Sequence, residues 1–268
     1  MRVAETLLRF LETGPWGAGF ERMTSTPEPP RCLFVHQDGS SAQLLLSRLP
    51  PCPQGHKRIV SISDTHGKHR LVQCPAADVL VHCGDILSRN ACALKNNGRN
   101  HKKGRVALRD FNDWLGEQSQ CRSKVVIGGN HDATLEEIGD ERAQQLLSNA
   151  TYLHDSAGEV EGLRIYGSPW SSGKSANRAF QANTPVGLLG KMHAARIDIL
   201  VCHSYNEALM GAVAPSLFLS GHSHGMFGVL HDSPCIAVNS SICDTVYRTA
   251  NFPVVHDMKA RCIGVHAD

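Results

Sequence analysis

Short apolar segments recur along the chain from residue 58 onward, and each of them runs into polar residues. They are rich in β-branched side chains, which is typical of strands that are buried on both faces of a sheet. Helical patterns separate several of them, at residues 106–115 and 136–147. Strands that alternate with helices predict an α/β fold built in layers. The seven segments that we expect to be strands contain "RIVSIS", "DVLVHC", "KVVIGG", "LRIYGS", "DILVCH", "LFLSGH" and "CIAVNS".

The first part of the chain follows a different pattern. Residues 1–10 suit a short amphipathic helix, and residues 14–30 are rich in Gly, Pro, Ser and Thr, which predicts a loop. Two apolar segments on either side of Asp38-Gly39 are typical of a β-hairpin. We therefore expect an N-terminal extension, residues 1–57, whose hairpin packs on a main domain formed by residues 58–268.

Polar residues capable of binding metals follow five of the expected strands. Ligands of α/β sheets gather at the carboxyl ends of the strands, so side chains that are distant in sequence can meet there. The motifs are D-x-H, G-D, G-N-H-D, a single H and G-H-x-H. Carboxylates, an amide and imidazoles form a mixed oxygen and nitrogen set that suits transition metals. The residues are Asp64, His66, Asp85, Asn130, His131, Asp132, His203, His222 and His224.

The last motif, "SGHSHG", places two imidazoles one residue apart between glycines. If the strand ends at Ser220 and the glycines allow a sharp turn, His222 and His224 can point toward one place. Taken singly, the motif residues have ordinary explanations, because Asp64 and Asp85 could be turn or cap residues. Five motifs in a fixed order, each at the end of a strand, favour a metal site.

The set of motifs resembles that of the calcineurin-like metallophosphoesterases. Further segments, among them "SISDTHGKH", "FNDWLGEQ" and "TYLHDSAGEVEGLRIYGSPW", resemble the MPPED-type (metallophosphoesterase domain-containing) branch, which is similar to class III cyclic nucleotide phosphodiesterases. The resemblance extends from Arg58 to Met258. It implies a layered sandwich of two mixed β-sheets flanked by helices, with a dimetal site at the carboxyl ends of the strands.

The resemblance also implies a role for each motif residue. Two divalent transition-metal ions are expected, of Mn, Fe, Zn or Ni, with Mn the first choice in an assay. The carboxylate of Asp85 would bridge them. His131 would be catalytic, stabilising the transition state and protonating the leaving oxygen, without binding metal. One ion would be held by Asp64, His66, Asp85 and His224, and the other by Asp85, Asn130, His203 and His222.

The implied function is a dimetal phosphoesterase, in the first place a phosphodiesterase that cleaves a cyclic nucleotide or another small diester by metal-activated hydroxide. Two alternatives stay open: a phosphomonoesterase or protein phosphatase, and a non-catalytic metal-binding scaffold for protein partners. Arg89 keeps the spacing of the arginine that contacts phosphate in the protein phosphatases, whereas Ser88 replaces their aspartate. Substrate binding by Arg89 is a hypothesis, and a plain surface arginine explains it equally well.

Two segments depart from the MPPED-type pattern. Residues 202–208 read "CHSYNEA", where that branch has a Gly-Pro-Pro turn after the histidine, so substrate preference could differ. Residues 96–105, "NNGRNHKKGR", are basic and follow Asp85 in the chain. We expect them to form a solvated loop, which could attract a phosphate-rich substrate.

The amino-acid composition limits the class of protein, the cellular compartment and the partners that we expect. The chain has 268 residues, of which 41% are hydrophobic, so it can bury a core, and its net charge of +2 lacks the basic bias of nucleic-acid binders. No apolar segment is long enough to span a membrane, and residues 1–10 do not read as a signal peptide. The ten cysteines form no CxxC pair, which favours reduced thiols in the cytoplasm. We expect a small-molecule phosphoester substrate, neither nucleic acid nor membrane as a partner, and leave the oligomeric state open.

Overall fold

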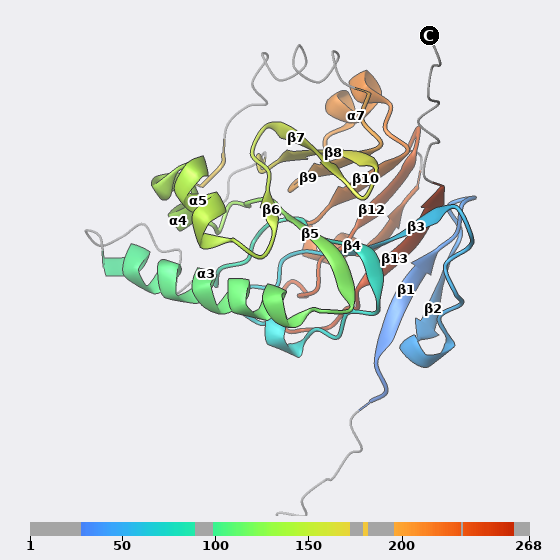
Figure 1. The fold of residues 1–268 in the computed structure, drawn as a ribbon, viewed down its shortest axis with the longest axis horizontal. Helices are drawn as coiled ribbons and strands as arrows, with labels where there is room; N and C mark the ends of the chain where they lie inside the picture. The colour runs from blue at the N-terminus through green and yellow to red at the C-terminus, as the bar shows by residue number, and fades with distance from the viewer. Residues whose placement is uncertain (1–27, 89–98, 172–178, 182–195, 232, 260–268) are drawn as a thin grey trace, which may run out of the picture.

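In the computed structural model, two β-sheets face each other and helices lie on their outer sides (Figure 1). The structure describes residues 28–88, 99–171, 179–181, 196–231 and 233–259. Within these residues, no helix combines the length and the apolar character needed to cross a membrane.

The first sheet has seven strands in the order β2-β1-β13-β3-β4-β5-β6. Strands β3 to β6 are parallel, β13 is antiparallel to β3, and β1 pairs with β13 in parallel. The hairpin of β1 and β2 thus extends the sheet at one edge. The strands are β1 Arg31–Val35, β2 Ser41–Leu45, β3 His56–Ile62, β4 Ala77–His82, β5 Cys121–Val126, β6 Thr151–Tyr152 and β13 Val254–Lys259.

The second sheet has six strands in the order β11-β12-β10-β9-β8-β7. Its four central strands are parallel, and the edge strands β7 and β11 are antiparallel to their neighbours. The strands are β7 Ser156–Val160, β8 Leu163–Ser168, β9 Ile199–Cys202, β10 Leu217–Ser220, β11 Gly228–Leu230 and β12 Ile236–Asn239.

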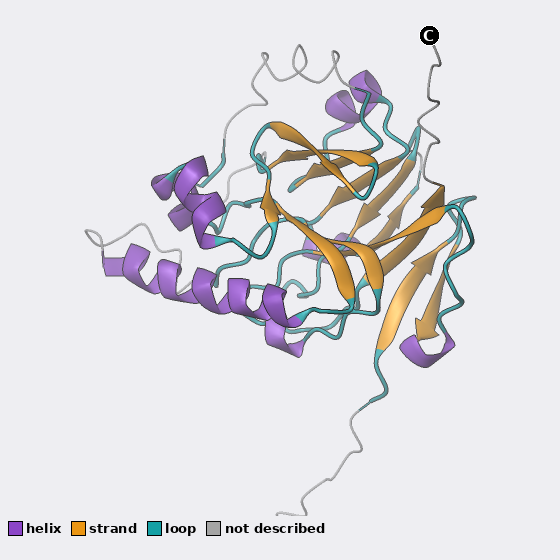
Figure 2. Ribbon diagram, in the orientation of Figure 1, coloured by secondary structure: helices purple, strands orange, loops and turns teal. Residues whose placement is uncertain are grey.

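Helices cover the outer faces of both sheets (Figure 2). The long helix α3 packs Leu108, Phe111 and Leu115 against the first sheet, at the spacing of one helical face. On the second sheet, α7 packs Leu209 and Met210 against the same cluster as Phe218. The helices are α3 Arg99–Glu117, α4 Ala133–Ile138, α5 Asp140–Leu146 and α7 Glu207–Val213, and the 3-10 turns are η1 Leu46–Arg48, η2 His69–Leu71 and η3 His224–Met226.

The main core lies between the two sheets. Successive residues of a strand point to opposite faces, so Val79 and Val81 of β4 enter this core while Leu80 faces the helices. Ile165 of β8 and Val201 of β9 meet them from the second sheet. The central strands are therefore buried on both faces, as their apolar segments predict, and the two mixed sheets flanked by helices confirm the expected fold class.

Three details differ from the sequence expectations or fall outside them. The helix expected at residues 136–147 is two helices, because Gly139 adopts a φ of 74° between α4 and α5. The basic segment 96–105 is not a loop from Arg99 onward, since α3 begins there. The helix expected at residues 1–10 lies outside the described residues, and the division of the chain at residue 57 stays a prediction.

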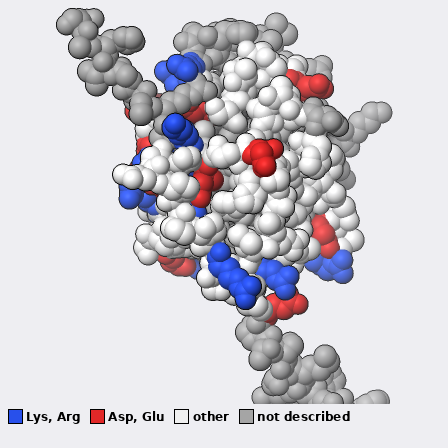
Figure 3. Space-filling model, turned by 90° about the vertical axis from the view of Figure 1, so that its right-hand side faces the viewer, with Lys and Arg blue, Asp and Glu red and all other residues white. Residues whose placement is uncertain are grey.

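The face drawn in Figure 3 carries basic and acidic groups side by side on a mostly uncharged surface. Mixed signs of this kind agree with the small net charge of the sequence. This face therefore has no broad surface of a single sign.

Candidate metal centre

The structure brings together all eight residues expected at the metal centre. They follow the carboxyl ends of five parallel strands, three in the first sheet and two in the second. The edges of the two sheets meet there, since the backbone N–H of His222 donates to Asp64 Oδ2 at 2.8 Å. Asp64 and His66 follow β3, Asp85 follows β4, Asn130 and His131 follow β5, His203 follows β9, and His222 and His224 follow β10.

The backbone is bent sharply at four of these residues. Asp64, His66, Asp85 and His222 have φ values of 52°, 46°, 57° and 65°, in the left-handed region that most side chains avoid. Such strain persists where surrounding contacts impose it, and it concentrates at functional sites. Gly221 shows how tight the packing is, because a Cβ atom there would lie 2.2 Å from Asp64 Oδ2.

One group of ligand atoms forms around His66 and His224. The Nε2 atoms of these two residues lie 3.2 Å apart, and His224 Nε2 lies 3.2 Å from Asp64 Oδ1. His66 Nε2 is 3.9 Å from both Asp64 Oδ1 and Asp85 Oδ2. These are the four residues expected to hold the first ion.

A second group forms around Asn130. Its Oδ1 atom lies 3.1 Å from His203 Nε2 and 2.8 Å from His222 Nδ1. His203 Nε2 is also 3.3 Å from Asp85 Oδ1. The carboxylate of Asp85 therefore presents one oxygen to each group, as a bridging ligand would.

The main chain fixes the tautomer of three imidazoles. A carbonyl oxygen can only accept, so each Nδ1 that faces one carries the proton, and the Nε2 atom of each ring faces the centre. The Nε2 atoms of His66 and His224 face each other, and His224 Nε2 also faces Asp64 Oδ1, so an ion between them would meet nitrogen and oxygen ligands. The donor set fits a transition metal. The bonds are His66 Nδ1 to Leu87 O at 3.1 Å, His203 Nδ1 to Cys83 O at 2.8 Å and His224 Nδ1 to Asp244 O at 2.8 Å.

His131 lies between the two groups. Its backbone N–H donates to Asp85 Oδ1 at 2.7 Å, and its ring packs 4.6 Å from the ring of His66. Burial lowers the pKa of His131 to about 4, although the charge of Asp85 acts in the opposite direction. Ligand atoms of His66, Asp85 and His131 also lie within 4.8 Å of one another. The assignment of His131 as proton donor rather than ligand therefore stays a prediction.

Comparison with known proteins decides the family. The calcineurin-like phosphoesterase family matches residues 57–226, which is more than half of the chain. The chain belongs to the calcineurin-like phosphoesterase family. Members of this family depend on two metal ions, and the chain is a hydrolase of phosphoric esters. The family resemblance seen in the sequence is confirmed.

Curated relatives place this phosphoesterase beside the MPPED-type proteins. Metallophosphoesterase domain-containing protein 1 of Homo sapiens is 30% identical over 254 residues, which cover 78% of this chain and 73% of the relative. A UPF0046 protein of Caenorhabditis elegans is 28% identical over 247 residues, with 78% and 83% covered. A solved crystal structure agrees in fold, with a TM-score of 0.53 at 15% identity, over 69% of this chain and 90% of that chain.

Asp132 is a residue of this phosphoesterase site whose role the sequence analysis did not identify. Its carboxylate accepts three backbone N–H groups, from Ile86 at 3.2 Å, Leu87 at 2.9 Å and Gly129 at 2.9 Å. These bonds tie the loop that carries Asp85 to the loop that carries Asn130 and His131. The final letter of G-N-H-D was the available signal, but its partners are backbone groups, which a sequence does not reveal.

His82 makes a similar connection on the other side of Asp85. Its Nδ1 atom accepts the backbone N–H of Gly84 at 3.3 Å, so Nε2 carries the proton and donates to Thr65 Oγ1 at 3.0 Å. The loops after β3 and β4 are thereby joined. Burial lowers the pKa of His82 to about 3, which keeps the ring neutral in this role.

Asp85 and His203 polarise each other strongly. Burial raises the pKa of Asp85, but the charge of His203, its hydrogen bond and the charge of His131 together outweigh burial and lower the value to about 2. Burial lowers the pKa of His203, but the charge and hydrogen bond of Asp85, together with the charge of Asp64, raise it to about 9. The protein thus keeps the Asp85 carboxylate ionised in a buried place.

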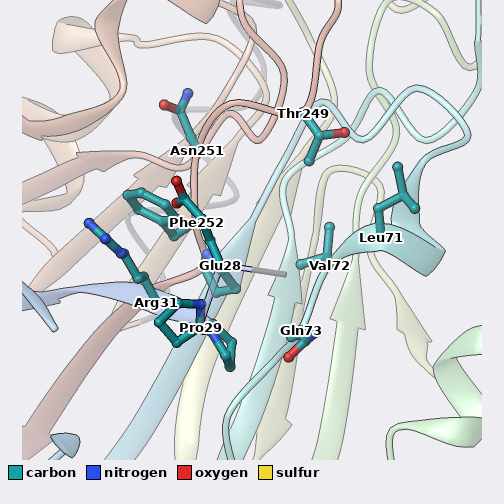
Figure 4. A pocket seen from close by; sticks show the side chains of 11 residues that line it. Glu28, Pro29, Arg31, Leu71, Val72, Gln73, Thr249, Asn251 and Phe252 are labelled. Atoms are coloured by element: carbon teal, nitrogen blue, oxygen red, sulfur yellow. The ribbon is translucent and has the colours of Figure 1, made fainter. Parts of the chain in front are cut away.

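Arg89, the hypothetical substrate contact, lies outside the described residues, so its role stays a prediction. A hollow of about 190 Å³ lies where residues 28–31, 71–73 and 249–253 meet (Figure 4), and none of the eight residues of the centre lines it.

Proposed function

We propose that this phosphoesterase is a phosphodiesterase that hydrolyses small diesters with two manganese ions. The observation that carries the proposal is the pair of ligand groups that share Asp85, in which imidazole nitrogens and carboxylate oxygens lie 3.2–3.9 Å from one another. Of the expected residues, Asp64, His66, Asp85 and His224 would hold one ion. Asp85, Asn130, His203 and His222 would hold the other.

Bound divalent ions would neutralise phosphate oxygens and lower the pKa of a water toward ~7. The remaining work falls to the protein. Asp85 stays ionised, and the imidazoles keep their tautomers through bonds to the main chain. His131, held through its backbone N–H by Asp85, would donate a proton to the leaving oxygen. A bound phosphate anion favours the protonated ring, so substrate binding itself would raise the pKa of His131.

The charges around the centre support a diester rather than a monoester. The charged groups that act most strongly on Asp64, Asp85 and His131 are carboxylates and imidazoles of the same cluster. A monoester dianion carries twice the charge of a diester and gains most from a nearby guanidinium or ammonium group. Among the residues that the structure describes, this surrounding of the centre favours the single charge of a diester.

The test compares two chromogenic esters, bis(p-nitrophenyl) phosphate and p-nitrophenyl phosphate, with added Mn²⁺ and with a chelator. We expect Mn²⁺-dependent hydrolysis with a higher kcat/KM for the diester. His56→Ala is the matched control, since His56 stands at the opposite end of β3 from Asp64 and should leave the rates unchanged. Preference for the monoester would show the alternative, a phosphomonoesterase. Bound metal without turnover of either ester would favour a scaffold.

We also infer that the protein works in the cytoplasm. The eight cysteines within the described residues are all free thiols, six of them buried, as expected in a reducing compartment. Microscopy of a fluorescent fusion would test this, and accumulation in a secretory compartment would refute it.

A further inference from the structure

Tyr247 lies beside the metal centre, although no sequence motif includes it. Its ring centroid is 4.7 Å from that of His66 and 5.2 Å from that of His224, and it stands edge-on to both. The ring of His131 is 6.0 Å away. Tyr247 therefore forms a wall of the centre next to the residue that would protonate the leaving oxygen.

The backbone of Tyr247 is unfavourable for an aromatic residue. Its φ of 64° lies in the left-handed region, where Gly and Asn are common and bulky side chains are rare. A local preference that is overridden in this way points to a role for the side chain. Tyr247 thus holds its ring beside His66 and His224 from a backbone conformation that aromatic residues rarely adopt.

The segment that carries Tyr247 has a fixed place relative to the centre. The carboxylate of Asp244 accepts two backbone N–H groups of this turn, at 3.0 Å and 2.8 Å, and the carbonyl of Asp244 accepts Nδ1–H of His224 at 2.8 Å. Lys68 donates to the carbonyl of Tyr247. The turn that orients His224 therefore also positions the Tyr247 ring.

Two exposed apolar side chains lie on the same segments. Met226, in the 3-10 turn that begins at His224, is 60% exposed, and Val246 is 62% exposed. The bond between His224 and Asp244 holds these two segments together. Apolar side chains beside a polar site can contact an apolar group of a ligand. Inorganic phosphate has no such group, whereas the alcohol of an ester does.

We propose that Tyr247, with Met226 and Val246, forms a subsite for the leaving alcohol of the ester and that it favours planar aromatic alcohols. The inference rests on the proposed function and names its substrate class. The proximity to His131 assigns the subsite to the leaving group, because this histidine would protonate that oxygen. An aromatic wall offers a planar ring stacking contacts that a small alkyl group cannot make.

The experiment compares methyl p-nitrophenyl phosphate with methyl trifluoroethyl phosphate, which differ in the leaving group alone. Nitrophenol is followed by absorbance and trifluoroethanol by fluorine NMR, with Mn²⁺ present. We expect Tyr247→Ala to lower kcat/KM by about tenfold for the aryl ester and by less than about twofold for the alkyl ester. Tyr247→Phe keeps the ring and should retain the aryl preference. Comparing variant with parent on one ester cancels the intrinsic reactivity of that ester.

Val106→Ala is the control for the loss of an exposed apolar side chain. Val106 is 57% exposed and lies on α3, in none of the metal-binding motifs. This variant should leave both rates unchanged. Equal losses for the two esters in Tyr247→Ala would overturn the inference, and so would an equal loss of aryl preference in Val106→Ala.

A second readout separates a substrate role from a structural one. Asn adopts a positive φ readily, so Tyr247→Asn should keep its bound metal and should melt at or above the temperature of the parent. A lower melting temperature together with lost metal would show that Tyr247 is structural and would overturn the inference. A parent that hydrolyses neither ester would refute the proposed function, and this inference with it. Hydrolysis of both esters without any effect of the ring would refute this inference alone.

Discussion

The two ends of strand β3 carry two buried polar clusters of opposite character. At the amino end, Arg58 and Asp257, 8% and 5% exposed, form a pair with two parallel hydrogen bonds of 2.7 Å and 2.6 Å. Arg58 also donates to the carbonyl of Pro50. At the carboxyl end, the Nε2 atoms of His66 and His224 face each other at 3.2 Å.

The difference distinguishes a structural cluster from a functional one. The donors of Arg58 match acceptors of the protein itself, so this cluster is complete when the chain has folded. The cluster at the other end brings imidazole nitrogens and carboxylate oxygens to 3.2–3.9 Å from one another, a set of groups that a metal cation would satisfy. A buried polar cluster therefore indicates a binding site mainly where the groups that face one another are of the same chemical kind, as two imidazole nitrogens are.

The largest effect is expected from Asp85→Asn. The amide cannot supply two negatively charged oxygens to the two ligand groups, so we expect loss of bound metal and a fall in kcat of at least about 10⁴-fold, to background. Metal analysis of the purified variant and the diester assay measure this. Asp78→Asn is the control, since Asp78 lies at the amino end of β4 and contacts Arg58. A variant with full activity would show that Asp85 is not the bridge.

His131→Ala should remove the proton donor and leave the ligands in place. We expect kcat to fall by about 10²–10⁴-fold while the metal content stays at that of the parent. Rates with p-nitrophenol esters, whose leaving oxygen needs little protonation, should fall less than rates with alkyl esters. Loss of metal in this variant would make His131 a ligand, as its distance from Asp85 also allows.

Arg58→Met tests the buried pair of Arg58 and Asp257 at the amino end of β3. Removing one partner of a buried ion pair leaves the other charge unsatisfied, which costs about 3–5 kcal/mol of the free energy of unfolding. Denaturant titration of the metal-free protein measures this cost. The variant Arg58→Met with Asp257→Leu should recover much of the stability, because no buried charge remains. At temperatures where the single variant is folded, its kcat should equal that of the parent.

Metal addition tests the cluster of His66 and His224 at the carboxyl end of β3. An ion that binds only the folded chain stabilises it, by about 2.7 kcal/mol at a concentration of 100 times Kd. The melting temperature of the parent should rise with Mn²⁺, and that of His224→Ala should rise less. The Arg58→Met variant should gain as much from Mn²⁺ as the parent gains. An equal response of His224→Ala and the parent would place the ion elsewhere.

The sequence predicts the parts of the molecule that follow local patterns. The doubly buried strands, the hairpin at Asp38-Gly39 and the convergence of the metal-binding motifs all correspond to the structure, because each depends on residues that are neighbours in the chain. The parallel pairing of β1 with β13 could not be predicted from the sequence, because it joins the two ends of the described chain.

Tertiary contacts explain the remaining differences between the sequence predictions and the structure. Gly104 suggests a loop by its composition, yet it lies inside α3, where a Cβ atom would approach Thr134 Oγ1 to 2.0 Å. The close packing of α3 on α4 therefore favours glycine within a helix, despite its low helix propensity. Asp132 contacts Ile86 and Tyr247 contacts His66, each of them more than 40 residues away in sequence, so no spacing rule would reveal these contacts.

The ligands of the centre come from loops between residues 64 and 224, and the main chain already sets their tautomers. An ion cannot gather such distant segments from an unfolded chain, as zinc does in small fingers. We therefore expect folding to come first and metal loading second. Ions would then exchange without rearranging the protein, and the metal found in the enzyme would follow the supply in its surroundings together with the general order of divalent affinities. Preparations grown on different metals should contain different ions in the same protein fold.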